Sequence, residues 1–165
     1  VIYNGSTVAS LLSTSATAPT MPSGYTYKAR VGSVYNDGSS NFVGFYQVDR
    51  TVYYNGYISA LSAGSATSYT SVSISTMAPP IAVSAIIVAY CVGDGVTNVT
   101  ASCYLGFDGA DDVAFLVARY NSPGPTSYSD TQTAVVSLPT AQTVYYYVSN
   151  AALDFSLYVS GYTIP

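Results

Sequence analysis

Strict alternation of apolar and polar residues constrains the fold of this chain more than any other feature. Val72 and Ile74 alternate with serines, and residues 98–107 place Val, Ala, Cys, Leu and Phe on one face and mainly Asn, Thr, Ser and Tyr on the other. A two-residue repeat is that of a β-strand with one buried face. No segment sustains the repeat of an amphipathic helix. The pattern therefore predicts an all-β protein.

Turn residues separate the expected strands. Asn36-Asp37-Gly38-Ser39-Ser40 is the strongest hairpin signal, with Gly38 expected to supply a positive φ, and Asn55-Gly56, Asp94-Gly95 and Asp108-Gly109 have the same character. Besides the two alternating segments, the expected strands are Thr7–Leu12, Tyr25–Tyr35, Phe42–Val48, Thr51–Leu61, Ile81–Val92, Val113–Tyr120, Gln132–Leu138, Thr143–Ser149 and Phe155–Tyr162. About ten short strands predict one antiparallel β-sandwich domain over residues 1–165, of jelly-roll type.

The residue types that are rare or missing narrow the function. The chain of 165 residues has no His and no Glu, only 7 % of its residues are charged, and its net charge is −4. Without the commonest general base we expect no enzyme, and four basic residues predict no nucleic-acid binding. No apolar run reaches the ~18 residues of a membrane helix. Because the chain opens at Val1 without Met, we expect it to be a processed or ordered fragment of a longer protein.

Three acidic residues on one Gly-containing loop are the candidate metal ligands. Asp108, Asp111 and Asp112 could offer oxygen ligands to a hard cation such as Ca²⁺. Their spacing differs from that of an EF-hand and no Glu follows to complete the site, so we favour solvated turn acids. We therefore predict no metal and no cofactor.

Cys91 and Cys103 are the two cysteines of the chain, and both lie in apolar segments. We favour two buried thiols, because free cysteine in an apolar segment behaves as a small buried hydrophobic residue. A disulfide across a hairpin is the alternative, if the turn is centred on Thr97 rather than on Asp94-Gly95.

The chain contains 18 tyrosines, and these are the candidate binding residues. In Tyr145-Tyr146-Tyr147 and Tyr53-Tyr54, adjacent rings must point to opposite faces of a strand, so at least one of each set faces away from the core. Such rings either cover the sheet or form a subunit interface or ligand platform. The candidate binding residues, expected to be exposed near loop tips, are Tyr53, Tyr54, Tyr57, Tyr120, Tyr128, Tyr145 and Tyr147.

The segment Ser13–Arg50 resembles a segment of bacteriophage virion proteins, of the tail, tail-fibre or general structural kind. There a Pro-x-Gly-Tyr-Thr element leads into a basic strand, a Gly, an Asp-Gly-Ser turn and an aromatic strand that ends in Gln. The matching positions are Pro22, Gly24, Tyr25, Thr26, Lys28, Arg30, Gly32, Asp37, Gly38, Ser39, Phe42, Phe45 and Gln47. The resemblance implies a component of the virion, and it supplies no catalytic or receptor-contacting residue.

Together these observations predict a non-enzymatic virion structural domain, located on the extracellular particle. We expect a homo-oligomer, a trimer, that contacts other virion proteins and attaches the particle to a host surface glycan as a tail-fibre or receptor-binding domain. A capsid decoration or head-fibre protein is the second interpretation. A bacterial surface adhesin, pilus-like subunit or carbohydrate-binding module is the third, because its composition would be similar.

Overall fold

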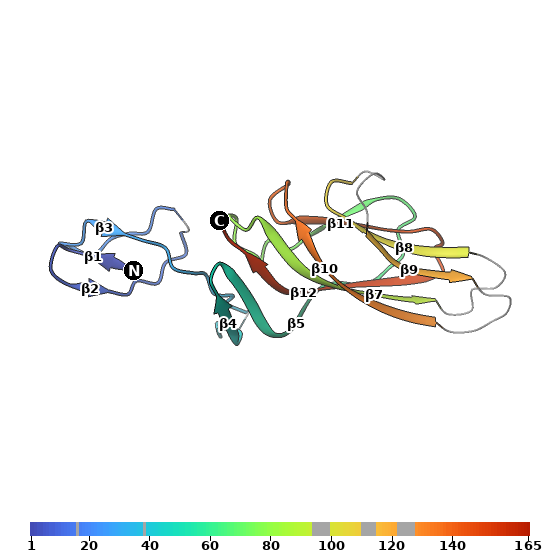
Figure 1. Cartoon of the computed structure of the whole chain (residues 1–165), viewed down its shortest axis with the longest axis horizontal. Coiled ribbons are helices and arrows are strands. Elements are labelled where there is room, and N and C mark those ends of the chain that lie inside the picture. Colours follow the sequence, from blue (N-terminus) through green and yellow to red (C-terminus); the bar gives the residue numbers. More distant parts are fainter. Residues whose placement is uncertain (16, 38, 94–99, 110–114, 122–127) are drawn as a thin grey trace.

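A computed structural model describes the chain except for residues 16, 38, 94–99, 110–114 and 122–127 (Figure 1). The described residues form antiparallel strands and contain no helix, so none that could span a membrane, and the all-β prediction is confirmed. The first strands are β1 (Ile2–Tyr3), β2 (Val8–Ala9), β3 (Tyr27–Lys28), β4 (Phe45–Val48), β5 (Thr51–Gly64) and β6 (Thr70–Ser73). The others are β7 (Ser84–Gly93), β8 (Thr100–Gly106), β9 (Phe115–Asn121), β10 (Tyr128–Ser137), β11 (Thr143–Val148) and β12 (Leu153–Thr163).

Strands β4 to β12 form two sheets that pack as a sandwich. The five-stranded sheet has the order β10-β7-β12-β5-β4, and the four-stranded sheet has the order β6-β11-β8-β9. Within them the pairing is nested, because β5 pairs with β12, β6 with β11, β7 with β10 and β8 with β9. A long hairpin that folds over onto two sheets gives this nested order.

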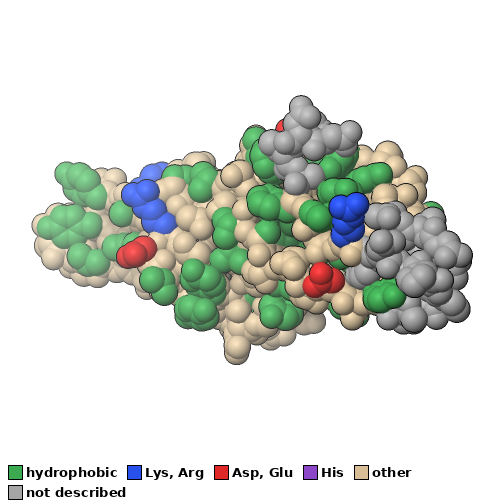
Figure 2. All heavy atoms as spheres, turned by 45° about the vertical axis from the view of Figure 1, so that its right-hand side comes forward, with side chains coloured by type: hydrophobic (Ala, Val, Ile, Leu, Met, Phe, Trp, Pro, Cys, Tyr) green, Lys and Arg blue, Asp and Glu red, His purple; other side chains and the backbone are tan. Residues whose placement is uncertain are grey.

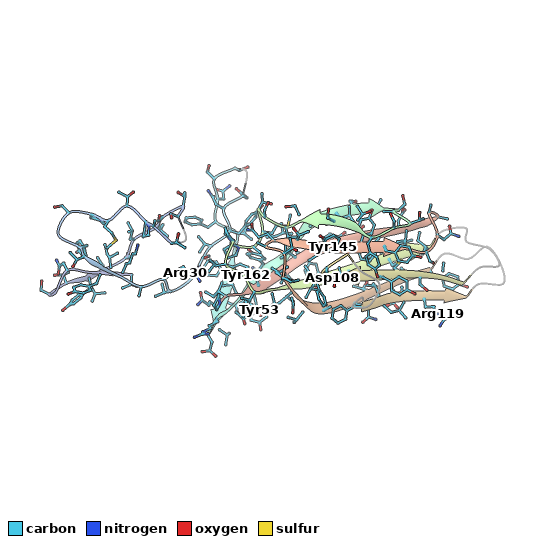
Figure 3. All side chains as sticks on the ribbon, turned by 90° about the horizontal axis from the view of Figure 1, so that it is seen from above. Arg30, Tyr53, Asp108, Arg119, Tyr145 and Tyr162 are labelled. Atoms are coloured by element: carbon cyan, nitrogen blue, oxygen red, sulfur yellow. A yellow bond between two sulfur atoms is a disulfide. The ribbon has the colours of Figure 1, made fainter. Side chains whose placement is uncertain are left out.

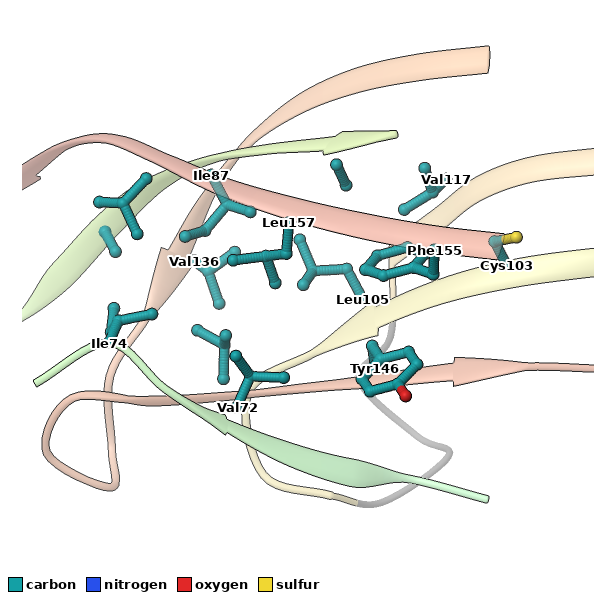
Figure 4. Packing of buried hydrophobic residues seen from close by; sticks show 14 of the residues in the cluster. Val72, Ile74, Ile87, Cys103, Leu105, Val117, Val136, Tyr146, Phe155 and Leu157 are labelled. Carbon is teal, nitrogen blue, oxygen red and sulfur yellow. The ribbon is translucent and has the colours of Figure 1, made fainter. Parts of the chain in front are cut away.

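Alternation places one face of each sheet in the core. In β11, Val144, Tyr146 and Val148 are buried while the residues between them face outward. In β12, Phe155, Leu157 and Val159 are fully buried in the same way. Figure 4 shows side chains from both sheets meeting between them. Burying large apolar side chains on both inner faces is what holds the two sheets together.

The two cysteines form a disulfide that joins the two sheets. Cys91 lies in β7 of the five-stranded sheet and Cys103 in β8 of the four-stranded sheet, with 6.5 Å between their Cα atoms. The prediction of two free thiols is therefore wrong. The hairpin alternative is wrong in its geometry, because β7 and β8 do not pair with each other and the bridge crosses the core instead.

Two local turn predictions had different outcomes. The hairpin at residues 36–41 is confirmed by a bridge between Asn36 and Phe42, although Ser40 has a positive φ of 64° and Gly38 lies outside the described residues. Asn55-Gly56, in contrast, is no turn but lies inside β5. There β5 carries extra residues opposite β12, and Gly56 adopts a φ of 124° at this irregularity.

The first 34 residues, called the arm below, differ from the sandwich. Strands of two residues, β1, β2 and β3, form a separate three-stranded sheet that projects from one end of the sandwich (Figure 1). The expected strands Thr7–Leu12 and Tyr25–Tyr35 are present only as Val8–Ala9 and Tyr27–Lys28. Among the described residues of the arm only Ile2 is buried, and none belongs to the core cluster.

Candidate functional site

The predicted tyrosines do not form one site, because the structure distributes them over the two sheets and the core. The prediction that adjacent tyrosines face opposite ways is confirmed. Tyr54 and Tyr146 point into the core, while Tyr53, Tyr145 and Tyr147 are half-buried on outer faces. All five residues lie within strands β5 and β11, so the prediction of positions near loop tips is wrong for the candidates among them.

Tyr54 is a core residue and not a surface binding residue. Its hydroxyl donates a hydrogen bond to the Met77 carbonyl, and its ring meets Tyr35 and Tyr162 edge-on at centroid distances of 5.9 Å and 6.0 Å. Burial, followed by the two neighbouring phenols, raises the pKa of Tyr54 well above its usual range. Burial also raises the pKa of Tyr162, whose hydroxyl donates to the Ser33 carbonyl at 2.8 Å. This tyrosine cluster therefore fastens the base of the arm to the sandwich.

Two tyrosine pairs lie on the five-stranded sheet. Tyr53 of β5 stacks on its cross-strand partner Tyr46 of β4, with ring centroids 4.9 Å apart and planes at 13°. Tyr57 is 69 % exposed and lies 6.3 Å from the ring of Tyr158 in β12. These are isolated pairs, so each offers one ring face rather than an extended surface.

An extended aromatic surface lies on the outer face of the four-stranded sheet. Tyr147 of β11 stacks on Tyr104 of β8 at 5.4 Å and contacts Tyr69, which precedes β6, at 5.5 Å. We call these three residues the tyrosine row. Tyr147 and Tyr104 are direct cross-strand partners, which explains why their rings meet. Of the row only Tyr147 is among the predicted residues, because Tyr69 and Tyr104 are not adjacent to it in the sequence.

Tyr145 and Asp108 extend this surface. Tyr145 lies two residues from Tyr147 on the same face of β11, and its ring packs over Gly109, 3.0 Å from where a Cβ atom would stand. Asp108 is exposed beside it, and Figure 3 shows both side chains at this sheet. Gly109 has a φ of 76°, so the predicted Asp108-Gly109 turn is confirmed. Asp111 and Asp112, the other two candidate metal ligands, lie outside the described residues.

The remaining two predicted tyrosines add little to this surface. Tyr128 begins β10 and packs against the core, half-buried. Tyr120 lies in β9, opposite Ala101 in β8, and its side chain is outside the described part of the chain. Neither position extends the tyrosine row.

A groove that the sequence did not predict lies where the arm meets the sandwich. Its volume is about 810 Å³, and we name it the arm groove for its lining side chains Leu12, Lys28, Arg30, Val31 and Phe42. Lys28 donates through Nζ to the Thr17 carbonyl at 3.0 Å, and Figure 3 shows Arg30 close to Tyr162 at the junction. No acidic residue lines the groove within the described chain. Only the tertiary structure brings Pro79 and Pro80 of the sandwich to its wall.

These two surfaces differ in what they can bind. The tyrosine row presents stacked phenols with hydroxyl groups and one nearby carboxylate, which suits stacking and hydrogen bonding to a polar ring. The arm groove combines apolar side chains with Ser and Thr hydroxyls and two cations. Among the described residues no three His, Cys, Asp or Glu side chains gather as metal ligands. Comparison of the chain with models of known protein families finds no match, and comparison with curated proteins finds none either.

Proposed function

We propose that this protein is a non-enzymatic structural component of a bacteriophage particle that attaches the particle to glycans on the host surface. Its place would be the extracellular virion, as a tail-fibre or receptor-binding domain. The nested order of β5 to β12, which fits a jelly roll, supports the proposal, as does the resemblance of Ser13–Arg50 to virion proteins. The observation that carries it is the tyrosine row on the outer face of the four-stranded sheet.

Stacking is the interaction that the row offers to a sugar. A pyranose presents a face of C–H groups that packs on an aromatic ring, while its hydroxyls need polar partners. Tyr147 and Tyr104 hold each other in place, so binding would freeze few additional torsions. The Asp108 carboxylate beside Tyr145 can accept hydrogen bonds from sugar hydroxyls. No catalytic step is assigned to the site.

Binding of the purified chain to host envelopes and to an array of bacterial glycans tests the proposal. Tyr147→Ala should weaken binding about tenfold or more, which corresponds to ~1.4 kcal/mol. Tyr57→Ala removes an exposed tyrosine from the other sheet and should leave binding unchanged. Wild-type protein that binds neither envelopes nor glycans would contradict the proposal, and so would a Tyr147→Ala variant that binds as well as wild type.

A capsid decoration or head-fibre protein is the second candidate, and the projecting arm favours it. An arm with exposed apolar residues is a means of attachment to a larger surface. Incubation of the chain with isolated heads and isolated tails separates the two candidates. Saturable binding to heads, combined with no binding to host envelopes, would favour the decoration role over host attachment.

A further inference from the structure

The arm groove has the composition of an uncovered protein interface. Its apolar members Leu12, Val31 and Phe42 are 75 %, 62 % and 59 % exposed. Figure 2 shows hydrophobic side chains gathered over the arm next to basic ones. Apolar side chains in such a concentration, rimmed by charge, mark a surface that another molecule covers.

The arm also lacks the means to be stable by itself. Each of its strands has two residues, and a sheet that small buries too little apolar surface to hold its shape in water. Its contacts with the sandwich are at its base, where Tyr162 and Gln47 donate hydrogen bonds to the carbonyls of Ser33 and Val31. The rest of the arm sheet therefore needs a partner.

Charge indicates that the partner is a second copy of this chain. The arm, residues 1–34, holds two of the four basic residues and no Asp, which gives a net charge of +2. Residues 35–165 hold the other two basic residues and all eight Asp, which gives −6. A basic arm and an acidic sandwich on the same chain attract each other between copies.

The edge strands of the sandwich differ in how well they fit this groove. In the described chain, β6 carries no charge and no exposed large apolar side chain, and β9 carries the cation Arg119. The edge strand β4 lies next to the arm itself, where Gln47 is bonded to Val31. The edge strand β10 presents an apolar Val135 that is 62 % exposed on its outer face, carries an exposed carboxylate, Asp130, on the opposite face, and contains no cation.

We propose that the arm groove binds edge strand β10 of a second copy of this chain. Val135 would pack against the apolar lining, while the negative charge of the sandwich, including Asp130 on the other face of β10, would attract the cations Lys28 and Arg30. Groove and strand lie on different parts of one molecule, so the contact is heterologous and closes into a ring such as a trimer or continues as a chain. The inference deepens the proposed function and rests on it, since the sequence predicts that such a virion domain is a homo-oligomer.

The solution molar mass of the full chain tests the inference. Wild type at high micromolar concentration should have the mass of at least two copies of the 17.2 kDa chain by light scattering. Leu12→Asp in the groove and Val135→Asp in β10 should each reduce the mass to one copy. Both residues are largely exposed, and circular dichroism and thermal unfolding check that each variant remains folded.

Leu116→Asp is the matched control, because it places the same charge at a half-exposed apolar position of β9. This variant should keep the wild-type mass. Wild-type protein with the molar mass of a single chain would overturn the inference. A Val135→Asp variant with the same molar mass as an oligomeric wild type would also overturn it. Host attachment would stay testable in both cases, since glycan and envelope binding are measured independently of mass.

Cross-linking identifies the two surfaces directly. Leu12→Cys and Val135→Cys variants, mixed and oxidised, should form a disulfide between the two different chains. Leu12→Cys mixed with Leu116→Cys should not. A Leu12→Cys variant that cross-links efficiently to itself would overturn the proposed pairing in favour of arm–arm contact.

Discussion

The arm and the sandwich are built from the same kinds of residue, yet only one of them has a core. Both are rich in Val, Tyr, Ser and Thr. In the sandwich, β12 pairs along nearly its whole length with β7 on one side and β5 on the other, and its apolar side chains are fully buried. In the arm, β1 pairs with β2 and β3 over two residues each, and Leu12, Val31 and Tyr27 remain exposed.

This difference teaches that β-forming composition alone does not produce a buried face. A strand buries its side chains only when long neighbours and a second sheet lie over it. Ser13–Gly24 contains two prolines, Pro19 and Pro22, and proline cannot donate to a ladder. The strands of the arm therefore stay short, and its apolar surface remains available to another molecule.

The largest expected effect comes from opening the core of the sandwich. Phe155 is fully buried and stacks on Tyr146 at 5.3 Å, so Phe155→Ala should lower the free energy of unfolding by about 3–5 kcal/mol. Leu12→Ala in the arm should change it by no more than about 0.5 kcal/mol at concentrations where the chain is monomeric. Urea unfolding compares the two. Equal losses would mean that the arm and the sandwich share one core.

Removing the disulfide should have the next largest effect. The bridge closes a segment with a sequence separation of 12, for which loop entropy predicts a stabilisation of about 3 kcal/mol. Reduction should lower the urea midpoint of wild type but not that of a Cys91→Ala/Cys103→Ala variant. Alkylation of the unfolded, unreduced protein that adds two labels would contradict the bridge and return the cysteines to thiols.

Alkaline pH should weaken the junction between arm and sandwich. The pKa of Tyr54 is raised in the folded protein, so above the ordinary tyrosine pKa near 10 the unfolded chain loses a proton that the folded protein keeps. The contribution of Tyr54 to the free energy of unfolding is therefore complete below about pH 10. It decreases as pH rises above that value, by at most ~1.4 kcal/mol per pH unit. Thermal unfolding from pH 8 upward should show a shallower decline for Tyr54→Phe. An identical decline in both proteins would contradict this assignment.

The smallest expected effect concerns the turn that follows the arm. Backbone hydrogen bonds from Asn41 and Ser39 hold the pKa of Asp37 below its ordinary value. Ionised Asp37 therefore stabilises the folded protein at pH values above the ordinary Asp pKa. This stabilisation is lost as the pH falls through the lower pKa of Asp37 in the folded protein. Asp37→Asn should therefore show a slightly smaller loss of thermal stability on acidification than wild type. Asp154→Asn, which removes an exposed charge from the central strand β12, serves as the control. An equal change in both variants would speak against a specific role of the turn.

Much of the sandwich could be predicted from local pattern, and much of the candidate site could not. The expected strand Thr143–Ser149 matches β11, and the opposite orientation of Tyr145 and Tyr146 follows from the two-residue repeat. The tyrosine row was missed because Tyr69, Tyr104 and Tyr147 belong to segments far apart in the chain. No spacing rule connects residues that meet only through the pairing of β11 with β8.

The sequence by itself determined that this chain forms strands and which side chains alternate along each of them, because a strand's faces depend on neighbouring residues alone. Which face turns inward was decided by the tertiary structure, as Tyr53 and Tyr54 illustrate. Long-range packing also decided that Cys91 and Cys103 bridge two sheets and that the arm stays outside the core. The physical reason is that burial and strand pairing depend on residues distant in the chain, whose encounters no local repeat encodes.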